Sequence, residues 1–162
     1  MLIGGPNRWN PYTKLLGFKK LRYLNPETME VNMPLTKISA PIHLSSNQVR
    51  ALAAAVQDGL VKTCNVPPND LFQLISRFDS EDIILDPHFG GVSRSKDACV
   101  IEVVFLLGRT DDQKRALFRH VAEQAVGSGF RADDIMIALV ENSRMDWSIG
   151  LGVAYADHHS KA

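Results

Sequence analysis

The sequence predicts an α+β (α/β) fold in which two β-α-β units form one four-stranded, mainly parallel sheet with two helices on one face. The first observation behind this prediction is an internal repeat. Residues 45–52 and 110–117 share a hydroxyl residue, a glutamine three positions later and then Arg-Ala-Leu. The second is that apolar runs precede and follow each copy of the repeat. A strand-helix-strand unit therefore occurs twice.

Each copy of the repeat begins with a capping box. Ser45 pairs with Gln48, and Thr110 pairs with Gln113; in this motif the hydroxyl and the amide satisfy each other's backbone donors at a helix start. Apolar residues at helical spacing follow the boxes, namely Val49, Leu52, Ala53, Val56 and Leu60 in the first copy and Leu117, Phe118, Val121, Ala122 and Ala125 in the second. This spacing predicts two amphipathic helices, each with one face to bury.

Strands are predicted on both sides of each helix. Residues 34–39 and 99–107 precede the helices, and residues 71–75 and 135–140 follow them after turns. A strand-helix-strand connection makes a parallel pair. Residues 100–107 are apolar at nearly every position, which is typical of a strand buried on both faces. Because two helices cover only one face, the sequence predicts a symmetric oligomer in which another copy covers the second face.

The composition of the chain argues against several classes of protein. The 162 residues suit one globular domain, and the zero formal net charge offers no basis for binding nucleic acid or an anionic membrane. No apolar run is long enough to span a bilayer. Cys64 and Cys99 lack the spacing of a zinc or redox site. We expect reduced cysteines, a cytoplasmic protein and a small-molecule partner.

Residues 1–33 differ from the rest of the chain. They contain five Lys or Arg residues but only two Glu, together with Gly-Pro and Asn-Pro turn signals. We interpret them as an N-terminal extension that is poorly ordered or not in the native protein, followed by a domain over residues 34–162. Codons for Met29-Glu30-Val31 can contain GGAGGT, a bacterial ribosome-binding sequence, just before the Met33 codon. We therefore expect translation to begin at Met33.

Several short motifs occur in a characteristic order: Met33-Pro34-Leu35, an Asp70 turn, Asp86-Pro87-His88-Phe89, Gly108-Arg109-Thr110 and Asp146-Trp147-Ser148. With the duplicated unit, they resemble the tautomerase superfamily over residues 34–155, in its malonate semialdehyde decarboxylase-like and 4-oxalocrotonate tautomerase-like branch. The resemblance implies the oligomeric tautomerase fold, a homotrimer, an amino-terminal proline as base and keto-enol activity on a phenylpyruvate-like 2-oxo acid. It implies no cofactor and no metal.

The chemistry predicted for Pro34 depends on its nitrogen. As a first residue, proline has a secondary amine that titrates near neutrality and can transfer protons. As an internal residue its nitrogen is an amide, which cannot. On spacing alone, the simpler interpretation is a proline tolerated at the start of a strand. The resemblance favours the catalytic base.

Arg109 and Asp70 are the other predicted catalytic residues. A guanidinium between a strand and a helix cap can hold a substrate carboxylate, although loop arginines are more often surface charges. The resemblance implies that Asp70 orients water or the substrate carbonyl; its alternative is a turn residue. The decarboxylase pattern has two arginines flanking one residue, whereas this chain has Leu107-Gly108-Arg109, which counts against decarboxylation.

Three residues are predicted to bind substrate. Trp147 is expected to form a pocket wall that excludes water, with a core or interface position as the alternative, and Phe72 and Gln73 are expected to line the pocket. The leading prediction is a keto-enol tautomerase. The alternatives are a malonate semialdehyde decarboxylase or hydratase, and a non-catalytic assembly module if the extension is retained.

Overall fold

The computed structural model describes residues 33–159 of the chain. By its internal contacts the chain divides into two units, Met1–Glu30 and Val31–Ala162. The predicted extension lies outside the described residues, apart from Met33. Everything below concerns the second unit.

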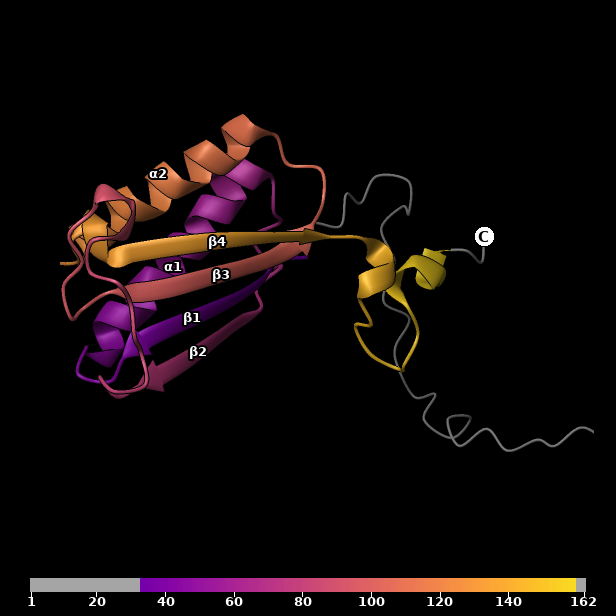
Figure 1. The fold of residues 1–162 in the computed structure, drawn as a ribbon. Helices are drawn as coiled ribbons and strands as arrows, with labels where there is room; N and C mark the ends of the chain where they lie inside the picture. The colour runs from indigo at the N-terminus through magenta and orange to yellow at the C-terminus, as the bar shows by residue number, and fades with distance from the viewer. Residues whose placement is uncertain (1–32, 160–162) are drawn as a thin grey trace, which may run out of the picture. The chain divides into compact units, whose positions relative to one another are not determined.

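Four strands and two helices form two layers (Figure 1). The strands are β1 (Leu35–Pro41), β2 (Gln73–Phe78), β3 (Cys99–Leu106) and β4 (Ile135–Asn142), and their order in the sheet is β2-β1-β3-β4. The β1-β2 and β3-β4 pairs are parallel, whereas β1 and β3 pair antiparallel. The prediction of two β-α-β units in a mainly parallel sheet is confirmed, and the antiparallel β1-β3 ladder joins the two units.

Both helices begin where the capping boxes predict. Helix α1 (Ser46–Cys64) follows Ser45, and α2 (Asp111–Gly127) follows Thr110; each hydroxyl accepts a hydrogen bond from the backbone N–H of the glutamine three residues later. Each glutamine side chain bonds back to the cap residue's backbone N–H. These reciprocal bonds satisfy donors that a helix start otherwise leaves unpaired. Local sequence therefore sets where each helix begins.

The core lies between the helices and one face of the sheet. Its fully buried side chains include Ile38, Leu52, Leu60, Ile101, Phe105 and Leu117, each no more than 1% exposed. Because side chains alternate along a strand, the neighbours of the core residues point to the opposite face. That face carries Leu74, Met136 and Val140, which are 55%, 40% and 42% exposed. Within residues 33–159, no helix or strand covers this face of the sheet.

Strand β2 differs from its prediction over residues 71–75. It occupies Gln73–Phe78, and Leu71 and Phe72 precede it with 54% and 55% of their surfaces exposed. The strand continues to Phe78 because its last residues pair with β1, Arg77 opposite Ala40 and Phe78 opposite Pro41. The apolar run alone could not show this contact, so the predicted strand ended too early.

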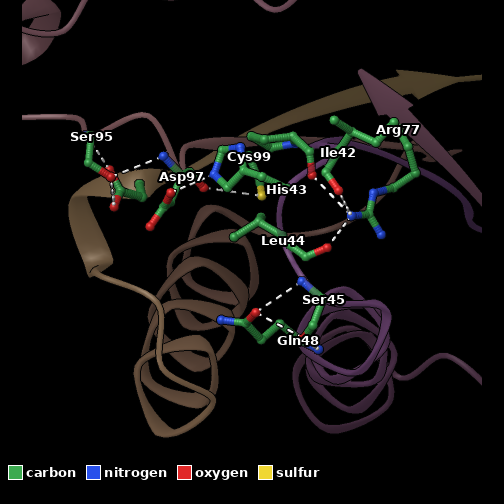
Figure 2. A network of polar contacts seen from close by, with 11 residues as sticks. Ile42, His43, Leu44, Ser45, Gln48, Arg77, Ser95, Asp97 and Cys99 are labelled. Atoms are coloured by element: carbon green, nitrogen blue, oxygen red, sulfur yellow. Dashed lines mark hydrogen bonds and ion pairs between the residues drawn. The ribbon is translucent and has the colours of Figure 1, made fainter. Parts of the chain in front are cut away.

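Polar contacts connect the loops at the end of the sheet where β1 and β2 finish (Figure 2). The Arg77 guanidinium donates to the carbonyls of Pro41, Ile42 and Leu44. Asp97 contacts His43 at 2.7 Å. Asp134, which is 1% exposed, accepts from the backbone N–H and the hydroxyl of Ser95 at 2.6 and 2.8 Å. We call this the far end of the sheet; its contacts hold the loops between elements.

Both cysteines are buried and free. Burial, with smaller contributions from Asp134 and Asp97, raises the pKa of the Cys99 thiol to about 12. A thiol with this pKa stays protonated at neutral pH and is a poor nucleophile. Within residues 33–159, no helix has both the length and the apolar character to span a membrane.

Candidate active site

Most of the predicted site residues lie at the end of the sheet opposite the far end. Pro34 precedes β1, Asp70 and Phe72 precede β2, Arg109 follows β3, and Trp147 follows β4. Because β1 and β2 run one way and β3 and β4 run the other, two strand starts and two strand finishes meet there. Figure 1 shows β4 leading directly into the C-terminal turns at this end. We call it the Pro34 end.

Pro34 is buried at the entrance to β1. The β1-β3 ladder pairs Leu35 with Val104, so one further step brings Pro34 opposite Phe105. Both residues lie on the helix side of the sheet by the alternation of their strands. In the chain as described, Met33 is bonded to the Pro34 nitrogen, and the Met33 side chain is itself only 8% exposed.

Arg109 is a buried cation, 8% exposed. Its guanidinium carbon lies 4.6 Å from the centre of the Phe105 ring, and it donates to the Leu106 carbonyl. Gly108 permits this arrangement, because its φ of +125° is strained for a residue with a side chain. The turn therefore directs the Arg109 side chain back toward β3, where its guanidinium lies beside the Phe105 ring.

The loop that carries Arg109 is fastened on both sides. Thr110 begins α2 with its capping box. On the other side, Glu141 of β4 contacts Lys114 at 2.7 Å. That lysine, and the backbone N–H groups of Gly108 and Arg109, lower the pKa of the Glu141 carboxyl. A carboxylate on β4 thus holds the backbone of the arginine loop in place.

Asp70 is partly buried at the start of β2. Its backbone carbonyl accepts from the Gln57 side chain at 3.3 Å, and its N–H donates to the Pro67 carbonyl at 3.0 Å. Burial raises the pKa of the Asp70 carboxyl, because a carboxylate loses hydration there. The turn interpretation is therefore correct for the backbone of Asp70. Its side chain has the perturbed titration typical of functional carboxyls.

Phe72 and Gln73 are less closely associated with Pro34. The Phe72 side chain is 55% exposed, while its carbonyl accepts from the Thr36 N–H at 2.9 Å. The Gln73 amide donates to the Ala53 carbonyl of α1 at 2.8 Å. It also lines a cavity of 520 Å³ between α1 and β2 that does not include Pro34 or Arg109. A substrate-lining role for both residues stays a prediction.

Trp147 and Tyr155 cover the Pro34 end from the C-terminal segment. The Trp147 indole N–H donates to the Asn142 side chain at 2.7 Å, and the Tyr155 N–H donates to the Trp147 carbonyl at 2.7 Å. Tyr155 is 4% exposed and forms a cluster with Met33 and Leu106, against which Trp147 packs. We call these four residues the Met33 cluster.

Tyr155 is a candidate site residue that the sequence pattern did not reveal. Burial raises the pKa of its hydroxyl, and the Asp70 carboxylate raises it further, whereas Arg144 lowers it. Asp70 and Tyr155 are thus electrostatically coupled although 84 residues separate them in the chain. A single tyrosine among the glycines of residues 150–155 has no recognisable spacing, so only the fold identifies it.

No group of three or more His, Cys, Asp or Glu side chains within residues 33–159 is placed to hold a metal ion. Together these residues comprise a buried guanidinium, a carboxyl of raised pKa and the Met33 cluster, one member of which is bonded to the Pro34 nitrogen. This combination can bind an organic anion and exclude water from it. With a free amine at Pro34, it can also move a proton.

The sequence matches known tautomerases. A family described as tautomerase enzyme matches residues 70–150, which include Asp70, Arg109 and Trp147. The chain is 30% identical over 123 residues to the probable tautomerase YusQ of Bacillus subtilis (strain 168), covering 75% of this chain and 97% of that protein. The chain therefore belongs to the tautomerase family.

Two solved structures share the fold at recognisable identity. One is FG41 malonate semialdehyde decarboxylase inhibited by 3-bromopropiolate, with a TM-score of 0.71 and 34% identity over 79% of this chain and 98% of that one. The other is a malonate semialdehyde decarboxylase described with decarboxylase and hydratase activities, with a TM-score of 0.69 and 28% identity over 76% and 97% of the chains. The predicted superfamily and fold are confirmed.

Proposed function

We propose that the chain is a keto-enol tautomerase for a small 2-oxo acid of the phenylpyruvate type, with Pro34 as its amino-terminal general base. One observation carries the proposal: Pro34 is buried directly before Leu35, which pairs with Val104 of β3, and the next residue of β3, Phe105, contacts the Arg109 guanidinium through its ring. The proposed base and a cation that can hold a carboxylate thus belong to adjacent strands at one end of the sheet.

The proposed reaction moves one proton within the substrate. The neutral Pro34 amine removes a proton from the carbon next to the ketone, and Arg109 holds the carboxylate and stabilises the enolate. The protonated amine then returns the proton to the enolate oxygen. An α-amino group ordinarily titrates at about 7.7 to 8.0, and burial beside a guanidinium favours its neutral form. The amine can therefore act as a base at physiological pH.

This mechanism requires the Pro34 nitrogen to be free. We propose that translation starts at Met33 and that hydrolysis of the Met33-Pro34 bond then releases the amine. The native protein would therefore begin at Pro34. The match to YusQ covers 97% of that relative and 75% of this chain, so a native protein shorter than the full chain would agree with the length of that relative.

A second candidate function is hydration or decarboxylation of a 3-oxo acid such as malonate semialdehyde. The likeness to malonate semialdehyde decarboxylases favours it, as does a partly buried Asp70 that can position water or the carbonyl. Leu107 counts against decarboxylation. This residue lies two positions before Arg109, its side chain is 65% exposed, and it cannot supply a second guanidinium. If the native protein retains residues 1–33, the Pro34 nitrogen is an amide, and we propose a non-catalytic assembly role instead.

We further propose a cytoplasmic homotrimer. The open face of the sheet carries half-exposed Leu74, Met136 and Val140, and burying it against other copies of the chain removes apolar surface from water. Native mass spectrometry of the protein beginning at Pro34 tests the subunit number. A monomer at micromolar concentration would contradict the trimer.

The decisive experiment compares three proteins: the full chain, the protein beginning at Pro34, and the latter with Pro34→Ala. Turnover of phenylpyruvate is measured in each, and products from malonate semialdehyde are analysed in parallel. We expect activity in the second protein and at least a roughly 100-fold loss in the other two. Equal activity in all three would refute proline catalysis, and acetaldehyde as the main product would favour the decarboxylase. Intact mass of the native protein shows where it begins.

A further inference from the structure

The sequence repeat gives the Pro34 end a counterpart at the far end of the sheet. By the alignment of the two helix caps, Pro34 corresponds to Cys99. Asp134 lies directly before the apolar run of its unit, as Asp70 does in the first unit. Because β1 and β3 pair antiparallel, Cys99 and Asp134 lie at the far end. The position of the candidate site in the first unit therefore occurs a second time.

This counterpart is not built for the proposed proline chemistry. Cys99 is joined to Ala98 by a peptide bond and is 0% exposed, and burial raises the pKa of its thiol to about 12. Asp134 is 1% exposed and accepts hydrogen bonds from the N–H and the hydroxyl of Ser95. Neither residue is therefore placed to transfer a proton at neutral pH, and a role of the far end would be in binding.

A cavity of about 250 Å³ adjoins these residues, in the connector between β2 and β3. We call it the connector cavity. Its lining combines apolar and polar side chains, which include Ile83, Leu85, Arg94, Ser95, Lys96 and Ala98. Ala98 directly precedes Cys99, and Ser95 is the residue that holds Asp134. The cavity therefore lies beside the counterpart of the candidate site.

The lining of the connector cavity has two cations, Arg94 and Lys96, and no acidic side chain. Among residues 33–159, no carboxylate forms an ion pair with either cation. The acids of the surrounding loops, Asp86, Asp97 and Asp134, each bond to other groups. Arg94 attracts Asp86 without contact, and this is the smallest of the effects that lower the pKa of that carboxyl. Two cations that line one cavity favour an anion between them.

Arg94 is held in place by the backbone around the cavity. Its Nη1 donates to the carbonyls of Asp86 and Phe89 at 3.2 and 2.8 Å, and its backbone N–H donates to the Pro87 carbonyl at 2.9 Å. Its Nε is buried and has no hydrogen-bond partner within the described residues. The guanidinium is thus fixed, but its donors are not all used. A side chain that is already ordered loses little conformational entropy when it binds a ligand.

We propose that the connector cavity is a non-catalytic binding site for a small organic carboxylate. Arg94 and Lys96 hold the carboxylate, and Ile83 and Leu85 pack against the organic group. This apolar lining favours an organic acid over inorganic phosphate, which has no apolar surface to bury. The cavity is smaller than the pockets that hold drug-sized ligands, so it suits an acid with no more than one ring. The inference does not depend on a free amine at Pro34.

Benzoate is the probe, because it combines a carboxylate with a ring and has no ketone for a tautomerase to convert. Its binding to the full chain is measured by isothermal titration calorimetry, and we expect saturation with a Kd of about 1 mM or tighter. Benzyl alcohol, which lacks the charge, and inorganic phosphate, which lacks the ring, should each bind at least tenfold more weakly. The absence of saturable benzoate binding would overturn the site, and equal binding of either comparison compound would overturn the ligand class.

Lys96→Gln tests the location of the site. Lys96 is exposed, so the variant should fold, and benzoate should bind at least tenfold more weakly because one of two cations is lost. The matched control is Lys62→Gln, since Lys62 is an exposed lysine of α1 outside the cavity; it should change the Kd less than twofold. Arg94→Gln should act as Lys96→Gln does. Should Arg94→Gln fail to fold, Lys96→Gln and its control still decide the location.

Arg109→Ala separates the connector cavity from the candidate active site. In the full chain it should leave the Kd for benzoate within twofold. Loss of binding in Arg109→Ala, with Lys96→Gln unchanged, would place benzoate at Arg109 and overturn the proposal. In the protein beginning at Pro34, Lys96→Gln should keep kcat/KM for phenylpyruvate within twofold, and a larger loss would contradict a non-catalytic site. If that protein turns over no 2-oxo acid, the proposed function fails while the benzoate measurements still stand.

Discussion

The two ends of the sheet hold their polar groups in different ways. At the far end, Arg77 donates to three backbone carbonyls, and Asp134 accepts two hydrogen bonds from Ser95. At the Pro34 end, Arg109 donates to the Leu106 carbonyl and also lies against the Phe105 ring, and burial raises the pKa of Asp70. Hydrogen bonds from charged side chains to the backbone stabilise loops, whereas burial of a carboxylate such as Asp70 lowers stability and is typical of functional sites.

The largest difference in activity is expected between two single variants, Arg109→Ala and Arg77→Ala. In the protein beginning at Pro34, Arg109→Ala should lower kcat/KM for phenylpyruvate by about 100-fold or more, because it removes the cation that holds the carboxylate. Arg77→Ala should leave kcat/KM within twofold but lower the free energy of unfolding by about 2 kcal/mol, since three carbonyls lose a charged donor. Steady-state kinetics and urea denaturation measure the two effects. Comparable loss of activity in both variants would contradict the assignment of Arg109 to catalysis and Arg77 to stability.

The buried carboxylate at the far end should matter for stability alone. Asp134→Ala leaves the N–H and hydroxyl of Ser95 without their partner at a site that is 1% exposed, so we expect the free energy of unfolding to fall by about 3 kcal/mol. The variant should retain its kcat/KM at temperatures where it is folded. An activity loss without a stability loss would place Asp134 in the mechanism instead.

The two ends should also respond to pH with opposite signs. The pKa of Asp70 is raised by burial, so the folded protein binds more protons than the unfolded chain, and stability falls as pH rises from about 4 through the raised pKa. Asp70→Asn should therefore be more stable than the parent at pH 7 and equal to it below about pH 3, where the parent carboxyl is protonated in both states. Thermal unfolding at several pH values measures this.

Asp86 is the matched control at the far end. Its carboxylate accepts from the N–H groups of His88 and Phe89 at 2.7 and 2.8 Å, and these bonds lower its pKa. This stabilisation is present above about pH 4 and is lost as pH falls through the lowered pKa. Asp86→Ala should therefore be less stable than the parent at pH 7, with a difference that shrinks in acid. A gain in stability at neutral pH in both variants would contradict the comparison.

The smallest contrast is between the two helix caps. Ser45→Ala and Thr110→Ala should each lower the free energy of unfolding by about 1 kcal/mol, because each removes a side-chain acceptor at a helix start. Only Thr110→Ala should also lower kcat/KM, by about two- to fivefold, since Thr110 directly follows Arg109. Equal kinetics in both variants would show that the cap does not position the arginine.

Local patterns were sufficient for much of the fold. The capping boxes at Ser45 and Thr110 placed both helix starts, and apolar runs located all four strands, because these signals depend on neighbours within a few residues. The limit of such patterns was the end of β2, where Arg77 and Phe78 pair with Ala40 and Pro41 of β1 and continue the strand beyond the apolar run. Long-range contacts of this kind leave no periodic trace.

The candidate site was likewise predictable from local sequence only in part. Pro34, Asp70, Arg109 and Trp147 each stood in a short motif, so residue type and order were enough to select them. Their placement at one end of the sheet depends on the antiparallel β1-β3 ladder, which joins two units that the repeat treats as equivalent. Tyr155 and the burial of Met33 depend on it too, because packing between residues far apart in the chain is set by the folded backbone and not by spacing along it.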